Sequence, residues 1–295
     1  MLSQPLRTAL ESAIGRATGA PFAIARATAA SGGCIHSSWV LESGAARYFA
    51  KTNDAVLAAT LAAEADGLAA LAGAGMRVPR PIAQGEAAGK AFLVLEYLPL
   101  ASGNAGAFRE LGRGLARLHH SSRGDAFGWH RDNFIGLTPQ SNTLHASWAE
   151  FWQRGRLAPQ LELAARNGYR GELQSLGRRV MDVVPALLRH AVAPSLLHGD
   201  LWGGNAGCLD DGTPVVFDPA VYYGDGEADL AMTELFGGFP GSFYDGYREV
   251  RPIDEDGYRR RRVLYNLYHV LNHLNLFGEE YRAQAERMME KLLAA

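Results

Sequence analysis

The secondary-structure signals of this chain change character once, at Pro99, and no other feature constrains the fold as much. Before Pro99, strand-like runs and turns surround a long helix-forming stretch, whereas helical periodicity dominates after it. A chain of 295 residues is long enough for two lobes with separate cores. We therefore predict an α+β fold, with a small β-rich lobe over residues 1–98 and a larger, mostly helical lobe over residues 99–295.

The first lobe is predicted to contain two helices and several strands. Apolar residues recur every four positions from Leu2 to Ile14, which indicates an amphipathic helix. The stretch AASGGCIHSS then forms a small-residue turn, and the strand RYFAK is expected to end at Lys51. Residues 55–71 are strongly helix-forming, and the apolar run 91–98 has the length of a strand.

The second lobe is predicted to be helical with two exceptions. Helices are expected over residues 109–120, 148–165 and 171–190. The exceptions are the LLHGD segment and the run PVVFD over residues 214–218, which reads as a short strand after an Asp-Asp-Gly turn.

Composition limits the class of protein. A net charge of −2, with 47% apolar and 20% charged residues, is typical of a globular protein and argues against nucleic acid as a partner. Cys34 and Cys208 are too few for a disulfide framework or a zinc site, which indicates a reducing compartment. The longest alanine-rich run contains Glu64 and Asp66, so we expect no apolar segment long enough to span a bilayer, and the N-terminus lacks a signal-peptide core. We therefore expect a cytoplasmic protein with no membrane partner.

Three oxygen-bearing side chains form the centre of the chemical argument. Asp200 and Asn205 share the loop that follows LLHGD, and Asp218 ends a predicted strand thirteen residues after the asparagine. One carboxylate can orient a hydroxyl nucleophile while the amide oxygen and the other carboxylate hold a hard cation such as Mg²⁺. This set suits phosphoryl transfer, in which the protein mainly positions the reactants and neutralises charge.

Phosphoryl transfer also needs a cation for the nucleotide phosphates. Lys51 is one of three lysines in the chain, and Glu64 lies thirteen residues later in the next predicted helix, where it can hold the ammonium in place. An ordinary surface ion pair is the alternative for these two residues. Gly32 and Gly33 can cover phosphates with backbone N–H groups, although a tight hairpin also uses a Gly-Gly pair.

The order of these motifs resembles that of the kinase-like phosphotransferases, which include aminoglycoside and choline kinases. The motifs follow one another as glycine turn, strand lysine, helical glutamate, EYL strand end, HGD loop and strand-end aspartate. Within that group the chain most resembles the fructosamine kinase, or ketosamine 3-kinase, family. The similarity rests on HGDLWGGN, on residues 218–239, on FGW followed by NFIGLTPQSN, and on LYHVLNHLNLFG. It covers nearly the whole chain.

The resemblance implies a two-lobed protein-kinase-like fold and ATP-dependent phosphorylation of the third-carbon hydroxyl of a fructosamine, ribulosamine or erythrulosamine. Phosphorylation destabilises the sugar adduct and frees the amine, a deglycation reaction. By motif position, the implied roles are catalytic base for Asp200, Mg²⁺ ligands for Asn205 and Asp218, a phosphate-holding pair for Lys51 and Glu64, and backbone contacts to adenine for Glu96, Tyr97 and Leu98.

Other side chains near these motifs have two interpretations each. His198 and Asp229 are expected to brace the catalytic loop, with acid–base chemistry as the alternative for the histidine. Trp202 is either core or a flat surface for a sugar. His269, Asn272 and His273 share one helix face, which either lines the acceptor pocket or belongs to the core. Separately, Asp225, Glu227 and Glu234 are expected to be structural or solvated carboxylates rather than a site for a cationic amine.

Cys34 lies in the glycine turn, where its thiol is either an inert small side chain or a group that oxidises reversibly and lowers activity. We expect a monomer, with a disulfide-linked dimer through Cys34 as the oxidised alternative.

Two alternative functions remain at this stage. An aminoglycoside- or choline-type kinase would use the same machinery with another acceptor, and a pseudokinase-like binding module would lack a catalytic element. For the favoured reading, Asp200 is expected to have an ordinary pKa and to act mainly by orienting the hydroxyl.

Overall fold

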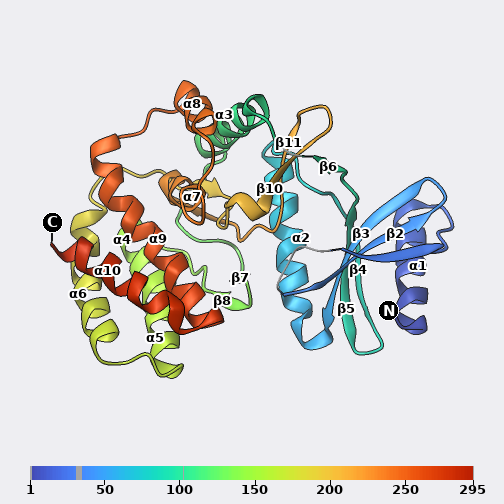
Figure 1. The fold of residues 1–295 in the computed structure, drawn as a ribbon, viewed down its shortest axis with the longest axis horizontal. Coiled ribbons are helices and arrows are strands. Elements are labelled where there is room, and N and C mark those ends of the chain that lie inside the picture. The colour runs from blue at the N-terminus through green and yellow to red at the C-terminus, as the bar shows by residue number, and fades with distance from the viewer. Residues whose placement is uncertain (1, 31–34, 102, 295) are drawn as a thin grey trace.

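The computed structural model describes residues 2–30, 35–101 and 103–294 of the chain. Figure 1 shows a small lobe, built around one sheet near the N-terminus, beside a larger lobe in which helices predominate. We call the described residues up to Leu98 the small lobe and those from Pro99 onward the large lobe. The predicted α+β class is confirmed, and the predicted boundary falls between strands β5 and β6.

The small lobe contains a five-stranded antiparallel sheet in the order β1-β2-β3-β5-β4. Its strands are β1 (Arg26–Ala30), β2 (Ser37–Ser43), β3 (Ala46–Asp54), β4 (Pro81–Ala87) and β5 (Lys90–Glu96). Strand β3 continues three residues beyond Lys51, because its pairing with β5 continues to Asp54 and Lys90. The expected strand end at Lys51 is therefore wrong, and the lysine lies within the sheet.

Two helices cover the sheet, one on each face. Helix α1 (Gln4–Thr18) shares a core with Phe92 and Val94 of β5, whereas helix α2 (Ala58–Gly73) shares one with Leu93 and Leu95. Because successive strand residues point to opposite faces, this double cover explains why β5 is a continuous apolar run.

Helix α2, with the 3₁₀ turn Ala55–Leu57 before it, is long and apolar enough in composition to cross a membrane. The expectation that no segment of the chain reaches that length is therefore wrong. In the structure, however, Leu61, Leu68 and Leu71 of this helix pack in the core shared with β5, and Glu64 is paired with Lys51. These contacts are those of a core helix in a folded lobe.

The large lobe confirms the predicted helices and adds several short strands. Its helices are α3 (Ala105–Ser121), α4 (Trp148–Phe151), α5 (Ala158–Arg166), α6 (Glu172–Leu187), α7 (Gly226–Thr233), α8 (Gly241–Val250), α9 (Glu255–Phe277) and α10 (Arg282–Leu293), with a π-helical turn at Trp152–Leu157 and 3₁₀ turns at Gly203–Asn205 and Glu279–Tyr281. Its strands are β6 (Leu100–Ala101), β7 (Asn133–Ile135), β8 (Thr138–Gln140), β9 (Ser195–Leu197), β10 (Ala206–Leu209), β11 (Pro214–Val216) and β12 (Tyr222–Gly224).

Short strands of the large lobe position the segments that carry Asp200 and Asp218. Strand β9 pairs with β12, and β10 pairs with both β11 and β6. The HGD loop follows β9, and Asp218 lies two residues after β11. Both segments therefore begin at the ends of paired strands. They lie on the side of the large lobe that packs against α2, and Figure 1 shows α2 between the sheet and β7.

Helix α3 packs against β9, the strand before the HGD loop, and is fixed by a close crossing with α8. A Cβ atom added at Gly112 would lie 2.0 Å from the carbonyl oxygen of Phe243, and one at Gly246 would lie 2.1 Å from that of Arg109. Since both neighbours are backbone atoms, the two glycines allow a helix approach that no larger residue permits.

We predict that Gly112→Ala and Gly246→Ala each lower the free energy of unfolding by about 1–3 kcal/mol, because the added methyl group pushes the helices apart. Chemical denaturation measures the effect. Gly114→Ala is the matched control in the same helix, since its Cβ would lie 3.7 Å from Met76 Sδ, an ordinary contact. This control is expected to be neutral or stabilising by up to about 1 kcal/mol. Equal stability of Gly112→Ala and Gly114→Ala would contradict the close crossing.

Candidate active site

A cavity of about 220 Å³ lies between the two lobes. Nine residues singled out from the sequence line it: Lys51, Glu64, Asp200, Trp202, Asn205, Asp218, His269, Asn272 and His273. Strand β3 and helix α2 supply the first two, the segments after β9 and β11 supply the next four, and α9 supplies the last three. The structure therefore brings together side chains that are more than 200 residues apart in the sequence.

Lys51 links the two lobes. Its ammonium nitrogen donates to Glu64 Oε1 at 2.7 Å and also to the carboxylate of Asp218. Burial alone would lower the pKa of Lys51, but the charges of Glu64 and Asp218 outweigh burial and raise it above the ordinary value. The ammonium therefore stays charged inside the cavity. The alternative of a surface ion pair is excluded, since the side chains of Lys51 and Glu64 are 8% and 9% exposed.

Asp200 lies beside Asn205, whose side-chain Nδ2 donates to the Asp200 carbonyl oxygen at 2.9 Å and to its carboxylate at 3.1 Å. Burial and the nearby charge of Asp218 raise the pKa of Asp200 to about 7, against the smaller opposing effect of the Asn205 hydrogen bond. The expected ordinary pKa is therefore wrong for the protein without ligands. A carboxylate with this pKa is a better proton acceptor at neutral pH than a solvated aspartate.

Asp218 adopts an uncommon backbone conformation, with φ of 56°. A non-glycine residue in this left-handed region needs support from its surroundings. Two buried amides supply it just downstream: Asn133 Nδ2 donates to the Val221 carbonyl at 2.7 Å, and Gln140 Nε2 donates to the Ala220 carbonyl at 3.2 Å. The β7–β8 hairpin thus fixes the chain that carries Asp218.

The histidine of the HGD loop braces its own turn. His198 Nε2 donates to the Phe217 carbonyl at 3.0 Å, and its Nδ1 accepts from the backbone N–H of Asp200 at 3.2 Å. Burial lowers the pKa of His198, which is consistent with this neutral form of the ring. One ring nitrogen therefore contacts the backbone of the HGD loop, and the other contacts the backbone just before Asp218.

Asp229 on α7 holds the same loop from the other side. Its carboxylate accepts from the backbone N–H groups of His198 and Gly199, each at 2.8 Å, and from His119 Nε2 at 3.2 Å. Gly199 has φ of 81°, and a Cβ there would lie 2.1 Å from the Ala220 carbonyl oxygen. The glycine of HGD is therefore required both by its conformation and by the nearby chain.

The donor atoms near Asp218 fit a hard divalent cation. Asn205 makes its hydrogen bonds through Nδ2, and no described residue donates to its Oδ1. That oxygen is therefore available to coordinate a metal ion. The side chain of Asp218 is 40% exposed, so its carboxylate can be approached from the cavity. An amide oxygen and a carboxylate are ligands that Mg²⁺ accepts together with phosphate oxygens.

A row of aromatic rings lies beside the cavity, and Trp202 and His273 at its two ends line the cavity. The exposed Trp202 meets Phe236 edge-on at 6.4 Å between ring centroids, and Phe236 lies 4.5 Å from His273. His273 Nδ1 donates to the carbonyl oxygen of His269, one helical turn earlier, at 2.8 Å. His269 is 4% exposed, and no described residue forms a hydrogen bond with its buried Nδ1. Asn272 instead bonds to Gln160 and Ile135, as a satisfied core residue does.

The structure does not bring every predicted residue to the cavity. Glu96 ends β5 and receives two hydrogen bonds from Arg77, at 2.9 and 2.8 Å, while Tyr97 and Leu98 follow in the link between the lobes. None of these three lies among the described residues that line the cavity. Gly32, Gly33 and Cys34 fall outside the described residues, and Cys208 is a buried free thiol.

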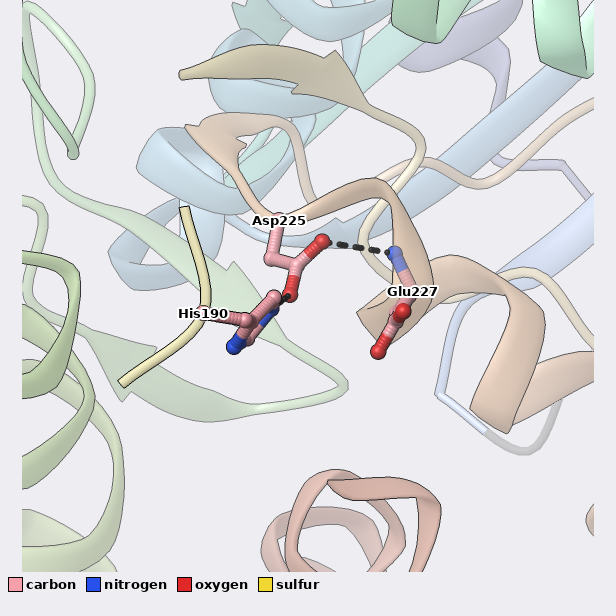
Figure 2. Close-up of side chains that lie close together, drawn as sticks. All are labelled: His190, Asp225 and Glu227. Carbon is pink, nitrogen blue, oxygen red and sulfur yellow. Dashed lines mark hydrogen bonds and ion pairs between the residues drawn. The ribbon is translucent and has the colours of Figure 1, made fainter. Parts of the chain in front are cut away.

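A second group of acid and imidazole side chains lies away from the cavity (Figure 2). His190 donates to Asp225 at 2.7 Å, and Asp225 also accepts from the backbone N–H of Glu227, which caps α7. Arg261 makes two hydrogen bonds to the Glu227 carboxylate, at 2.6 and 2.9 Å. These groups serve as an internal ion-pair network, and Glu234 is likewise paired, with Arg262.

The sequence profile of the family described as fructosamine kinase matches residues 6–295. The chain belongs to the fructosamine kinase family. A "probable ketoamine kinase" of Synechocystis sp. is 47% identical over 281 residues, which cover 95% of this chain and 94% of that relative. A chloroplastic protein-ribulosamine 3-kinase of Oryza sativa subsp. indica is 40% identical, over 89% of this chain and 77% of its own length.

Among solved structures, a Haemophilus somnus protein assigned as a fructosamine-3-kinase superposes with a TM-score of 0.88 at 30% identity, over 96% of both chains. These findings confirm the family and the two-lobed kinase-like fold expected from the motifs.

Sequence reasoning missed the supporting residues of this fructosamine kinase family site. Asn133 and Gln140 lie in the NFIGLTPQSN stretch, which was used only as a sign of resemblance, yet they fix the chain after Asp218. His119 was also missed as a partner of Asp229. No local pattern marks Asn133 and Gln140 for this role, because their carbonyl partners lie 88 and 80 residues away in the sequence.

The burial of His269 predicts how the stability of the protein depends on pH. Burial lowers its pKa from 6.5 to about 3, so the unfolded chain binds a proton that the folded chain does not. The stabilising effect of the neutral ring is complete above pH 6.5 and is lost as the pH falls toward 3. Lowering the pH from 7 to 5 should therefore reduce the free energy of unfolding of the wild-type protein by about 2 kcal/mol through His269 alone.

His269→Gln should remove that loss, so the stability gap between variant and wild type should narrow by about 2 kcal/mol on going from pH 7 to 5. Urea denaturation at both pH values measures it. His120→Gln, at an exposed position of α3, is the control and should keep the wild-type pH dependence. A constant gap for His269→Gln would show that the ring is not held neutral.

Proposed function

We propose that this member of the family transfers the γ-phosphoryl group of ATP to the third-carbon hydroxyl of a ketosamine, with Mg²⁺ as the metal ion. The observation that carries the proposal is the convergence of Asp200, Asn205 and Asp218 with the Lys51–Glu64 pair on one cavity. The ketoamine kinase and ribulosamine 3-kinase relatives support this choice of acceptor. The preferred ketosamine can be a fructosamine, ribulosamine or erythrulosamine.

Lys51 supplies the positive charge that the nucleotide phosphates need. Its ammonium is charged and is held by Glu64 at 2.7 Å, so it requires little reorganisation when phosphate oxygens arrive. Its second partner, the carboxylate of Asp218, is also a proposed ligand of Mg²⁺. Asn205 Oδ1 and Asp218 would hold the ion, which would neutralise phosphate charge when bound.

Asp200 acts on the acceptor. Its carboxylate would accept a hydrogen bond from the sugar hydroxyl and orient the oxygen toward the γ-phosphorus. As the new P–O bond forms and the bond to the β-phosphate oxygen breaks, the hydroxyl proton passes to Asp200. The pKa of about 7 favours this late transfer at neutral pH, although a cation bound nearby would lower it.

The alternatives differ in substrate or in activity. An aminoglycoside- or choline-type kinase would keep this machinery, and the family match over residues 6–295 favours a ketosamine instead. A pseudokinase-like binding module would lack part of the set, whereas Lys51, Glu64, Asp200, Asn205 and Asp218 are all present around one cavity.

Substituting Asp200 tests the assignment of the base. Asp200→Asn should lower kcat by about 100- to 10,000-fold, because the amide cannot take the proton. Nucleotide affinity, measured by calorimetry, should change by no more than about twofold, because Asp200 faces the acceptor. Asp210→Asn, in the turn between β10 and β11, is the control and should keep wild-type turnover. Wild-type turnover in Asp200→Asn would refute the role.

A substrate panel tests the reaction. Purified protein should consume ATP with ketosamines and not with choline or an aminoglycoside, and chelation of divalent ions should abolish the reaction. Asn205→Ala should raise the Mg²⁺ concentration for the half-maximal rate by about tenfold or more, the effect of losing one ligand worth about 1.4 kcal/mol. Faster turnover with choline or an aminoglycoside than with any ketosamine would contradict the proposal.

A further inference from the structure

Helix α2 belongs to the small lobe but is hydrogen-bonded to the large lobe. One oxygen of the Asp66 carboxylate accepts from the indole nitrogen of Trp129 at 2.8 Å, and the other lies 3.3 Å from His130 Nε2. Trp129 is the last residue of the FGW stretch and His130 follows it, and both lie between α3 and β7. The carboxylate therefore spans the two lobes at the middle of α2.

The next residue of α2 packs directly against the large lobe. A Cβ atom at Gly67 would lie 3.0 Å from Pro219 Cγ and 3.3 Å from Val221 Cγ1. Pro219 immediately follows Asp218, so the helix packs against the chain that carries this carboxylate. The Asp66 bonds and the Gly67 contact are independent of each other, and both hold α2 on the same side of the cavity.

The position of α2 determines the geometry of the phosphate-binding lysine. Glu64 lies two residues before Asp66 in the same helix and reaches Lys51 at 2.7 Å. Because a helix moves as a rigid unit over so short a distance, release of Asp66 would displace Glu64 as well. Lys51 would then lose the partner that directs its ammonium into the cavity.

Trp129 is itself held in place by the large lobe. Its ring packs against Tyr223 of β12 at 5.3 Å between centroids, and β12 pairs with β9, the strand before the HGD loop. The indole thus connects the α2 helix to the strands that present the catalytic loop. Neither Asp66 nor Trp129 lines the cavity.

We propose that Asp66 and Trp129 are positioning residues for phosphoryl transfer: their hydrogen bond holds α2 against the large lobe and thereby keeps Glu64 on Lys51. The pair acts through Glu64 and contacts neither nucleotide nor acceptor. The active arrangement of the lysine is therefore built into the fold through a contact between the lobes. This inference rests on the proposed phosphoryl transfer.

The test is a set of single and double variants. Asp66→Ala and Trp129→Phe should each lower kcat/KM for ATP by about tenfold, as expected for loss of a hydrogen bond to a charged group. Asp66→Asn keeps an acceptor oxygen for the indole and should restore most of the activity. The double variant Asp66→Ala/Trp129→Phe should have a kcat/KM for ATP no lower than that of the less active single variant, because both changes break the same bond.

A Glu64→Gln background separates positioning from a general loss of stability. If Asp66 acts through Glu64, Asp66→Ala should lower kcat/KM for ATP by less than about twofold in that background. Asp54→Ala, which removes an exposed ion pair with Lys90 in the same lobe, is the control and should keep wild-type kinetics. If Asp66→Ala lowered kcat/KM equally in the wild-type and Glu64→Gln backgrounds, the proposal would be overturned. A lower melting temperature of Asp66→Ala with unchanged kcat/KM would also overturn it.

Nucleotide affinity keeps this test independent of the acceptor. Calorimetry with a non-hydrolysable ATP analogue should show weaker binding by Asp66→Ala than by the wild type, and no such difference in the Glu64→Gln background. If the wild type binds nucleotide but phosphorylates no ketosamine, the proposed function fails while this comparison still decides the role of Asp66. Unchanged nucleotide affinity in Asp66→Ala, with unchanged kcat/KM, would refute the positioning role alone.

Discussion

The ammonium of Lys51, shared between a carboxylate of the small lobe and one of the large lobe, is the interaction on which the rest of the structure depends. A buried lysine charge is costly unless it is paired, and here Glu64 and Asp218 provide the pairing. In the proposed reaction this charge would also serve the nucleotide phosphates. Nucleotide binding would then exchange one anionic partner of the lysine for another and leave the lysine in place.

This arrangement persists because each anionic partner is fixed by its own contacts with the large lobe. Helix α2, which carries Glu64, is held by the Asp66–Trp129 hydrogen bond and by the close packing at Gly67. The strained segment at Asp218 is held by amides of the β7–β8 hairpin. A stretch of about fourteen residues, 129–142, thus supports both anionic partners of one lysine. Residues 133–136 of the same stretch also line the cavity.

Much of this could be predicted from the sequence, because the catalytic motifs are local. The order of Lys51, Glu64, HGD and Asp218 indicated the fold, the family and the residues around the cavity. What failed depended on contacts between distant segments. Nothing local to Asp200 predicts its raised pKa, since burial and the charge of Asp218 cause it. The composition of α2 is close to that of a membrane span, and only its packing between the sheet and the large lobe identifies it as a core helix.

The most direct test of the account is a crystal structure of the protein with Mg²⁺, a non-hydrolysable ATP analogue and a ketosamine. The account predicts Lys51 Nζ within hydrogen-bonding distance of both Glu64 and a phosphate oxygen, the metal ion on Asn205 Oδ1 and Asp218, and the third-carbon hydroxyl against the Asp200 carboxylate. A nucleotide bound away from Lys51, or an acceptor hydroxyl bound out of reach of Asp200, would contradict it.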